Sequence, residues 1–381
     1  MGPTGTTPRG SVVPAVDPAA APATDADETG DLLGIAARRR RFVGWAGGLL
    51  VVLIGSVLLG VAWGSVSLAP GVVAGVLADR SGFPVEVTWA PSVDAIVWQV
   101  RLPRVLLGVA VGAGLAVCGV ALQAMVRNVL ADPYLLGINS GASSGAAAAI
   151  LFGFAAGLGQ HALSVSAFLG AMAASALVYG IARSGGQVTA VRLLLAGVVV
   201  GYALYATTSF LIFASGSAEG ARSVLFWLLG SLGLAQWGSP LVVVLVVVAL
   251  TVVLLMLSSR QLDLLMIGDA TARALGTSAA AARTRLLLLV SLCIGVVVAA
   301  AGSIGFVGLV VPHLARRAVG AKHAYVVPVA ALMGAILLVW ADIVARTLLA
   351  PQEIPIGIIT SLVGAPFLLI LVRRLHASAT G

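Results

Sequence analysis

Long apolar stretches recur from residue 42 to residue 372 and leave little of the chain between them. Most approach the roughly 20 residues that a helix needs to cross a bilayer. Only 9% of the residues are charged, against about 25% in an ordinary soluble domain. A soluble fold of this size needs a charged surface, which this composition cannot supply. The sequence therefore predicts an all-α polytopic membrane protein.

About ten transmembrane helices are predicted, joined by short connections except in three places. The predicted spans are residues 42–64, 103–126, 137–157, 162–183, 192–214, 239–258, 284–302, 304–318, 325–349 and 356–372. The longer and more polar connections are residues 65–100, 215–238 and 259–283. The second of these predicts a short helix around 222–232. Small residues at 139–145 predict a close approach of the third span to a neighbouring helix.

Residues 1–41 differ from the rest of the chain, being rich in Pro, Ala, Thr and Gly with several acidic side chains. Such a segment cannot bury a core, so we expect a disordered tail that ends in the basic run at 38–41. A ten-span domain is predicted over 42–374, followed by a short tail over 375–381. The basic run before the first span predicts a cytoplasmic N-terminus.

The basic residues support this topology. Ten spans place both termini in the cytoplasm, and the assignment puts 17 of the 22 basic residues on that side. The five on the outer side are Arg80, Arg101, Arg104, Arg222 and Arg346. The net charge of +8 is therefore explained by membrane insertion, and nucleic-acid binding is not expected.

Three of the outer arginines oppose the usual insertion bias. Arg101 and Arg104 open the second span, and Arg346 lies at the outer end of the ninth, one helical turn after Asp342 with which it can pair. They could dock an acidic partner or reach lipid phosphates. Carboxylates inside the spans are otherwise scarce, which argues against a proton relay.

Two further features indicate function. Residues 268–276 predict a short helix in the connection at 259–283, with Asp269 capping its start; it could contact a cytoplasmic partner or be a simple connector. The glycines at 302–308, with Pro351 and Pro355, predict broken helices that line a cavity.

The single lysine, Lys322, does not follow a glycine-rich loop, so no nucleotide site is expected. The sequence also predicts no catalytic residue, metal site or bound cofactor.

Several motifs together resemble one family over residues 42–374, the permease subunits of the iron-siderophore, haem and vitamin B12 ABC importers (type II importers). The motifs are RLPR at 101–104, LQA at 122–124, RNVLADP at 127–133, LGI at 136–138, SGA at 140–142, GDATARALG at 268–276, GSIGFVGLVVPH at 302–313, ADIVAR at 341–346, EIPIG at 353–357 and GAP at 364–366. The resemblance implies short outer helices around 222–233 and 353–360. It also implies a cytoplasmic coupling loop.

The resemblance further implies a set of partners in the plasma membrane. They are a second permease subunit (identical or closely related), a cytoplasmic dimer of ABC ATPases and an extracytoplasmic binding protein. It assigns docking of the binding protein to Arg101, Arg104 and Arg346. The residues matching the ATPase-coupling segment are Gly268, Asp269, Ala272, Arg273, Leu275 and Gly276. Asn128 and Leu130 match the cytoplasmic gate, although Val129 replaces the usual proline of the family.

A ferric siderophore is the expected cargo because it is the commonest in such families. Haem and cobalamin are alternatives carried on the same scaffold. An ion-coupled secondary carrier is the alternative from another class. The scarcity of carboxylates within the spans and the coupling-like segment both argue against that carrier.

Overall fold

The computed structural model describes residues 2, 34–64, 66–183 and 186–379, and the regular secondary structure in these ranges is entirely helical. Most of the predicted N-terminal tail lies outside the described residues. The first helix, α1, runs over Ile35–Ala62, so the basic run Arg38–Arg41 belongs to its first two turns and not to the tail. Helix α15, Ile356–Ala379, likewise continues into the predicted C-terminal tail. Hydropathy marks only the apolar part of a helix. Both helices extend beyond that part because Ala and Arg have high helix propensity.

Within the described residues, seven helices are long and apolar enough to cross a membrane, two of them counted together with the short helical turns that precede them. They are α1, α4 (Leu102–Val126), α6 (Ala162–Arg183), α7 (Ala190–Ser215), α9 (Ser239–Leu257), α12 (Ala279–Ala301) and α14 (His323–Thr347). Three further helices match the other predicted spans, namely α5 (Ile138–Phe152), α13 (Val307–Val319) and α15. The all-α polytopic fold is confirmed. Helix α13 has only 13 residues and rises about 20 Å, less than a hydrocarbon core of about 30 Å.

Short helices occupy the connections between the long helices. They are α2 (Pro70–Arg80), α3 (Pro91–Ala95), the π-helix η2 (Ile96–Arg101), the 3-10 helices η3 (Pro133–Leu136) and η4 (Ala156–His161), α8 (Ala218–Leu228), α10 (Ser259–Ile267) and α11 (Asp269–Ala274). Prolines open α2 and α3, where the missing N–H is not needed. The helix predicted at 222–232 is α8, which begins and ends four residues earlier.

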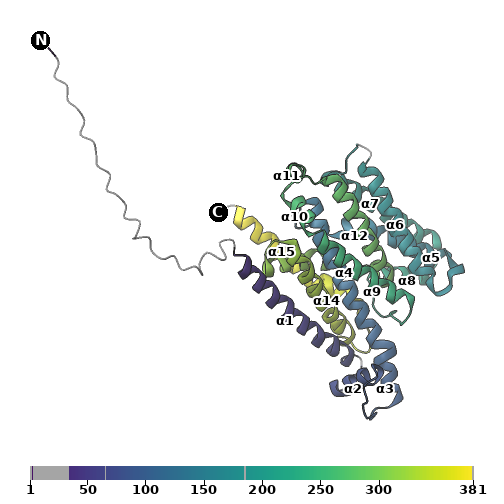
Figure 1. The fold of residues 1–381 in the computed structure, drawn as a ribbon. Coiled ribbons are helices and arrows are strands. Elements are labelled where there is room, and N and C mark those ends of the chain that lie inside the picture. Colours follow the sequence, from purple (N-terminus) through teal and green to yellow (C-terminus); the bar gives the residue numbers. More distant parts are fainter. Residues whose placement is uncertain (1, 3–33, 65, 184–185, 380–381) are drawn as a thin grey trace, which may run out of the picture.

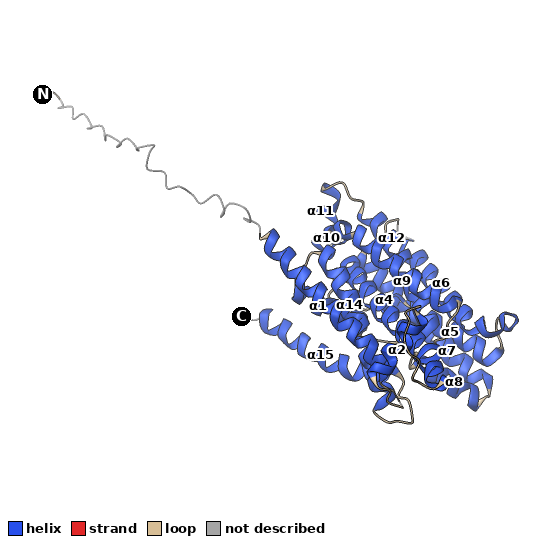
Figure 2. Ribbon diagram, turned by 60° about the horizontal axis from the view of Figure 1, so that its bottom comes forward, coloured by secondary structure: helices blue, strands red, loops and turns tan. Residues whose placement is uncertain are grey.

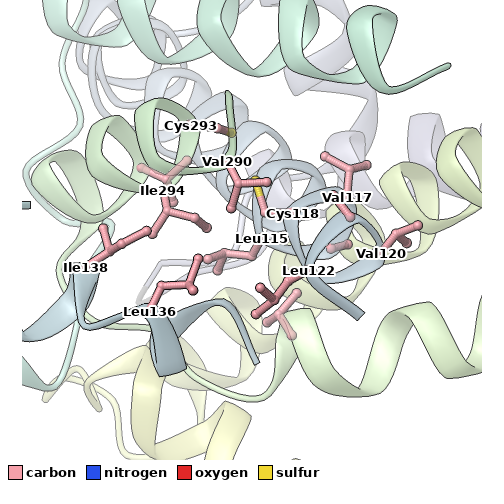
Figure 3. Packing of buried hydrophobic residues seen from close by; sticks show 14 of the residues in the cluster. Leu115, Val117, Cys118, Val120, Leu122, Leu136, Ile138, Val290, Cys293 and Ile294 are labelled. Atoms are coloured by element: carbon pink, nitrogen blue, oxygen red, sulfur yellow. The ribbon is translucent and has the colours of Figure 1, made fainter. Parts of the chain in front are cut away.

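Helix α4 forms the centre of the bundle, and nearly all of its side chains are buried. It packs against α9, α12, α13 and α14, and Figure 3 shows the aliphatic side chains gathered around it. The closest approach is to the start of α13, because a Cβ on Gly119 would lie 1.9 Å from the carbonyl oxygen of Gly308. The two helices can therefore pack this closely only because residue 119 is a glycine.

Helices α5 and α6 form a second close pair at the edge of the bundle (Figure 1). A Cβ on Gly141 would lie 2.3 Å from the carbonyl oxygen of Gly170, and one on Gly145 would lie 2.0 Å from that of Ser166. The close approach predicted from the small residues at 139–145 is confirmed, because side chains of any size at these glycines would separate the two helices.

The connections divide between two ends of the bundle. The start of α1 and the end of α15, together with α10 and α11, lie at one end, and α2 and α8 lie at the other (Figures 1 and 2). We refer to these as the termini end and the far end. An even number of crossings is required to bring both ends of the chain to the same side, as the ten-span prediction assumed.

Candidate functional site

Three interruptions of helix meet at the far end. They are the segment after α8, the break between α12 and α13, and the segment before α15. The amide of Ser231 donates to the carbonyl of Ala301 at 2.8 Å, and the amide of Gly357 donates to that of Leu229 at 3.0 Å. These bonds between breaks satisfy backbone groups that the helices leave free. The discontinuous helices predicted from the glycines and prolines are thus present and in mutual contact.

A cavity of about 970 Å³ opens among these breaks. Gly230, Gly302 and Pro355 contribute its irregular backbone, and Trp227 and Trp237 contribute large aromatic faces. Irregular backbone at membrane depth is stable only where it is buried in protein or lines a cavity. The observed lining agrees with the prediction that the broken helices border such a space.

Arg104, at the start of α4, lines this cavity. Its guanidinium lies 2.9 Å from Asp342 of α14 and 2.9 Å from Glu353 in the segment before α15. Asp342 is buried, with 3% of its side chain exposed, whereas the Glu353 side chain is 49% exposed. Sequence reasoning missed Glu353 as a site residue, although it lies in one of the recognised motifs.

Arg346 shares the same buried carboxylate. Its Nε lies 2.9 Å from Asp342, as the spacing of one helical turn predicted, and its Nη2 donates to the carbonyl of Gly60 at 2.9 Å. Arg101 lies apart from this cluster and donates to the carbonyls of Val61 and Ala62 at the end of α1. The structure therefore joins two of the three predicted docking arginines through Asp342, and all three are largely buried.

The predicted gate residues lie at the termini end, in the turn that follows α4. The side-chain Oδ1 of Asn128 accepts a bond from the amide of Leu130 at 2.9 Å, and its carbonyl accepts from the amide of Ala131 at 3.1 Å. An Asx-type bond of this kind fixes a turn without proline. Val129 is accommodated between them, and we refer to residues 128–131 as the gate turn.

Asp132 follows the gate turn and begins η3. Its carboxylate accepts a bond from the amide of Tyr134 at 2.8 Å, which is the usual role of an N-cap aspartate. Burial nevertheless raises the pKa of Asp132 to about 6, and the bond from Tyr134 opposes this rise only in part. The group can therefore change its charge near neutral pH.

The predicted coupling segment is formed by α11 and its two flanking glycines. Gly268, with φ of 140°, precedes the helix, and Gly276, with φ of 76°, follows it. Leu275 is 57% exposed and Ala272 is buried, so one face is anchored and the other is open to a partner. Arg273 is also exposed.

The prediction that Asp269 caps α11 is wrong. The N-cap is Gly268, with no side-chain bond, and the carboxylate of Asp269 instead pairs with Arg283 of α12 at 2.6 Å. Hydrogen bonding to this guanidinium holds the pKa of Asp269 below its ordinary value. A buried arginine that needs a counter-ion competes successfully with the helix terminus for the same carboxylate.

The sequence model of the FecCD transport family matches residues 50–374. The chain belongs to the FecCD transport family. The whole N-terminal tail, residues 1–41, lies outside this match, as the resemblance in the sequence implied.

Curated relatives are similar to this chain over most of their length. The haemin transport permease HmuU of Yersinia pestis is 43% identical over 77% of this chain and 89% of its own length. The Fe(3+)-citrate import permease YfmD of Bacillus subtilis is 40% identical over 73% of this chain and 81% of its own. The cobalamin import permease BtuC of Halobacterium salinarum is 41% identical over 76% of both chains.

A solved structure supports the same assignment. An ABC transporter described as metal-chelate type, in an inward-facing conformation, superposes on this chain with a TM-score of 0.75 and 34% identity. The match covers 86% of this chain and 98% of the other. This FecCD protein is therefore a multi-pass permease subunit of an ABC importer. ATP hydrolysis belongs to a separate ATPase subunit, and a substrate-binding protein completes the system.

Proposed function

We propose that this permease carries a metal chelate across the membrane and that its cargo is a ferric siderophore. The far-end cavity is the observation that carries the proposal. It is large, lined by tryptophans and by a paired Arg104 and Glu353, and bordered by broken helices. An aromatic wall with a few charged groups suits a bulky, partly apolar chelate.

The relatives support chelate transport and also favour a second cargo. The names of the relatives include haemin, Fe(3+)-citrate and cobalamin, so an iron chelate is common to two of the three. Haem is the second candidate because the haemin permease is 43% identical to this chain. The siderophore is preferred because it is the commonest cargo in families of this kind.

The proposal includes an arrangement of partners. Two copies of this chain form the pathway, the termini face the cytoplasm, and α11 contacts the ATPase. The binding protein docks at the far end over Arg104, whose side chain is 11% exposed. Arg346 and Arg101 then support this surface from within, because their side chains are held by Asp342 and by carbonyls of α1.

The test is reconstitution of the complete importer. The cognate binding protein is purified from cells and its bound ligand is identified by mass spectrometry. The permease, the ATPase and the binding protein are then placed in liposomes, and uptake of a ferric siderophore, of haem and of cobalamin is compared with and without ATP. ATP-dependent uptake of the siderophore alone supports the proposal. Uptake without the ATPase, or uptake that a protonophore abolishes, would instead indicate a secondary carrier.

A further inference from the structure

One buried side chain at the termini end joins three helices. Arg283 lies in the second turn of α12, and 1% of its side chain is exposed. Its two terminal nitrogens donate to both carboxylate oxygens of Asp269 at 2.7 and 2.6 Å. Its Nε donates to the carbonyl of Met125 at 2.9 Å. The guanidinium therefore connects α11 to the end of α4.

The bond to Met125 has a physical reason. Met125 lies in the last turn of α4, where the carbonyls have no partner within the helix. A cation at this position is favoured by the helix dipole, and the buried guanidinium in turn requires acceptors for its N–H groups. If the end of α4 separated from Arg283, the carbonyl of Met125 and an N–H group of the guanidinium would both be left buried and unpaired.

The end of α4 is also fixed to the gate turn. Gln123 is fully buried, and its Nε2 donates to the carbonyl of Ala131 at 3.3 Å. The amide of Asn128 donates to the backbone carbonyl of Gln123 at 3.2 Å. Arg316 of α13 donates to the side-chain oxygen of Gln123 at 2.6 Å, which holds this amide group in place. The gate turn must therefore follow the last turn of α4.

We propose that Arg283 is a positioning residue that transmits displacement of α11 to the gate turn through the end of α4. This inference rests on the proposed function, in which α11 contacts the ATPase and the gate turn closes the pathway. The three nitrogens of the planar guanidinium each make one of these bonds, two to Asp269 and one to Met125. Lysine cannot reproduce this geometry.

A purely structural role gives a different expectation. If Arg283 only stabilises the fold, its loss lowers the amount of folded complex, but each folded complex still opens its gate when ATP is used. The discriminating quantity is therefore the response of the gate turn for each ATP hydrolysed, and not the activity alone.

The experiment uses the complete complex in liposomes, with ATP as the probe. A cysteine introduced as Val129→Cys carries an environment-sensitive fluorophore, and the native Cys118 and Cys293 are buried, so the reagent reaches the new thiol. The variants Arg283→Gln and Asp269→Asn are compared with Arg285→Gln. The last is a matched control, since Arg285 is an exposed arginine on the same helix.

We expect Arg283→Gln to reduce the ATP-driven fluorescence change per ATP hydrolysed by between about twofold and thirtyfold, the range of mutations that act on coupling. Asp269→Asn should have a smaller effect in the same direction, because Met125 remains bonded. Arg285→Gln should match the parent protein. Equal responses in all four proteins would overturn the proposal.

Three other outcomes are distinguishable. If Arg283→Gln does not assemble, the test rests on Asp269→Asn. The side chain of Asp269 is 30% exposed, and its replacement leaves α12 and α4 connected. An unchanged response of Asp269→Asn then overturns the proposal. If the parent protein itself shows no response to ATP, the gate assignment fails, and the role of Arg283 fails with it. If the parent responds but transports no chelate, only the cargo assignment fails.

Discussion

Removal of the buried carboxylate at the far end should destabilise the protein strongly. In Asp342→Asn, Arg104 keeps Glu353 as a partner, but Arg346 loses the carboxylate 2.9 Å from its Nε and keeps carbonyl acceptors such as that of Gly60. Breaking a buried ion pair by removal of one partner costs about 3–5 kcal/mol. For a chain of this size we expect Tm to fall by about 4–6 °C.

The neighbouring carboxylate supplies a matched control. Glu353 binds the same arginine, but its side chain is 49% exposed, so Glu353→Gln should cost about 1 kcal/mol or less. Purified protein in detergent is heated, and unfolding is followed by intrinsic tryptophan fluorescence. The double variant Asp342→Asn with Arg346→Met restores the balance of charge and should recover part of the lost stability. Equal Tm values for the two single variants would refute the reasoning that burial sets the cost.

Three other predictions concern packing, protonation and the gate turn. Gly119→Ala should lower Tm through a clash with Gly308, at a cost of about 1–3 kcal/mol, whereas Gly55→Ala should not lower it, because its Cβ meets open space and alanine favours the helix. Burial raises the pKa of Asp132 to about 6, so the folded protein binds this proton more tightly than the unfolded chain; stability should fall as pH rises from about 4 to 6, and Asp132→Asn should remove that slope in Tm measured against pH. Asn128→Ala should loosen the gate turn by about 1 kcal/mol and speed its proteolytic cleavage, whereas an unchanged rate would count against the Asx-type bond as its support.

Hydropathy and the positions of glycine and proline predicted much of the fold. The apolar stretches mark nearly every long helix, because a segment that faces lipid must be apolar whatever its neighbours. The glycines at 139–145 and 302–308 correctly indicated a close helix pair and a broken helix. The ends of α1 and α15 were misplaced, since their outer turns leave the apolar region and are invisible to hydropathy.

The partners of the charged residues were harder to predict. Arg104 stands at a helix end in the sequence, but the carboxylates that neutralise it lie 238 and 249 residues further along the chain. Asp269 stands where a capping residue is expected, and its use by Arg283 follows from the packing of α12 against α11. Local patterns identify which side chains are unusual, whereas the fold decides what they bind.

Helix α4 carries a buried polar cluster at each end. At the far end Arg104 ties it to α14 through Asp342, and at the termini end the carbonyl of Met125 ties it to α12 through Arg283. A change of access from one end to the other requires α4 to move with these partners or to break from one of them. The contact between Arg104 and the half-exposed Glu353 costs least to break, because water can replace it.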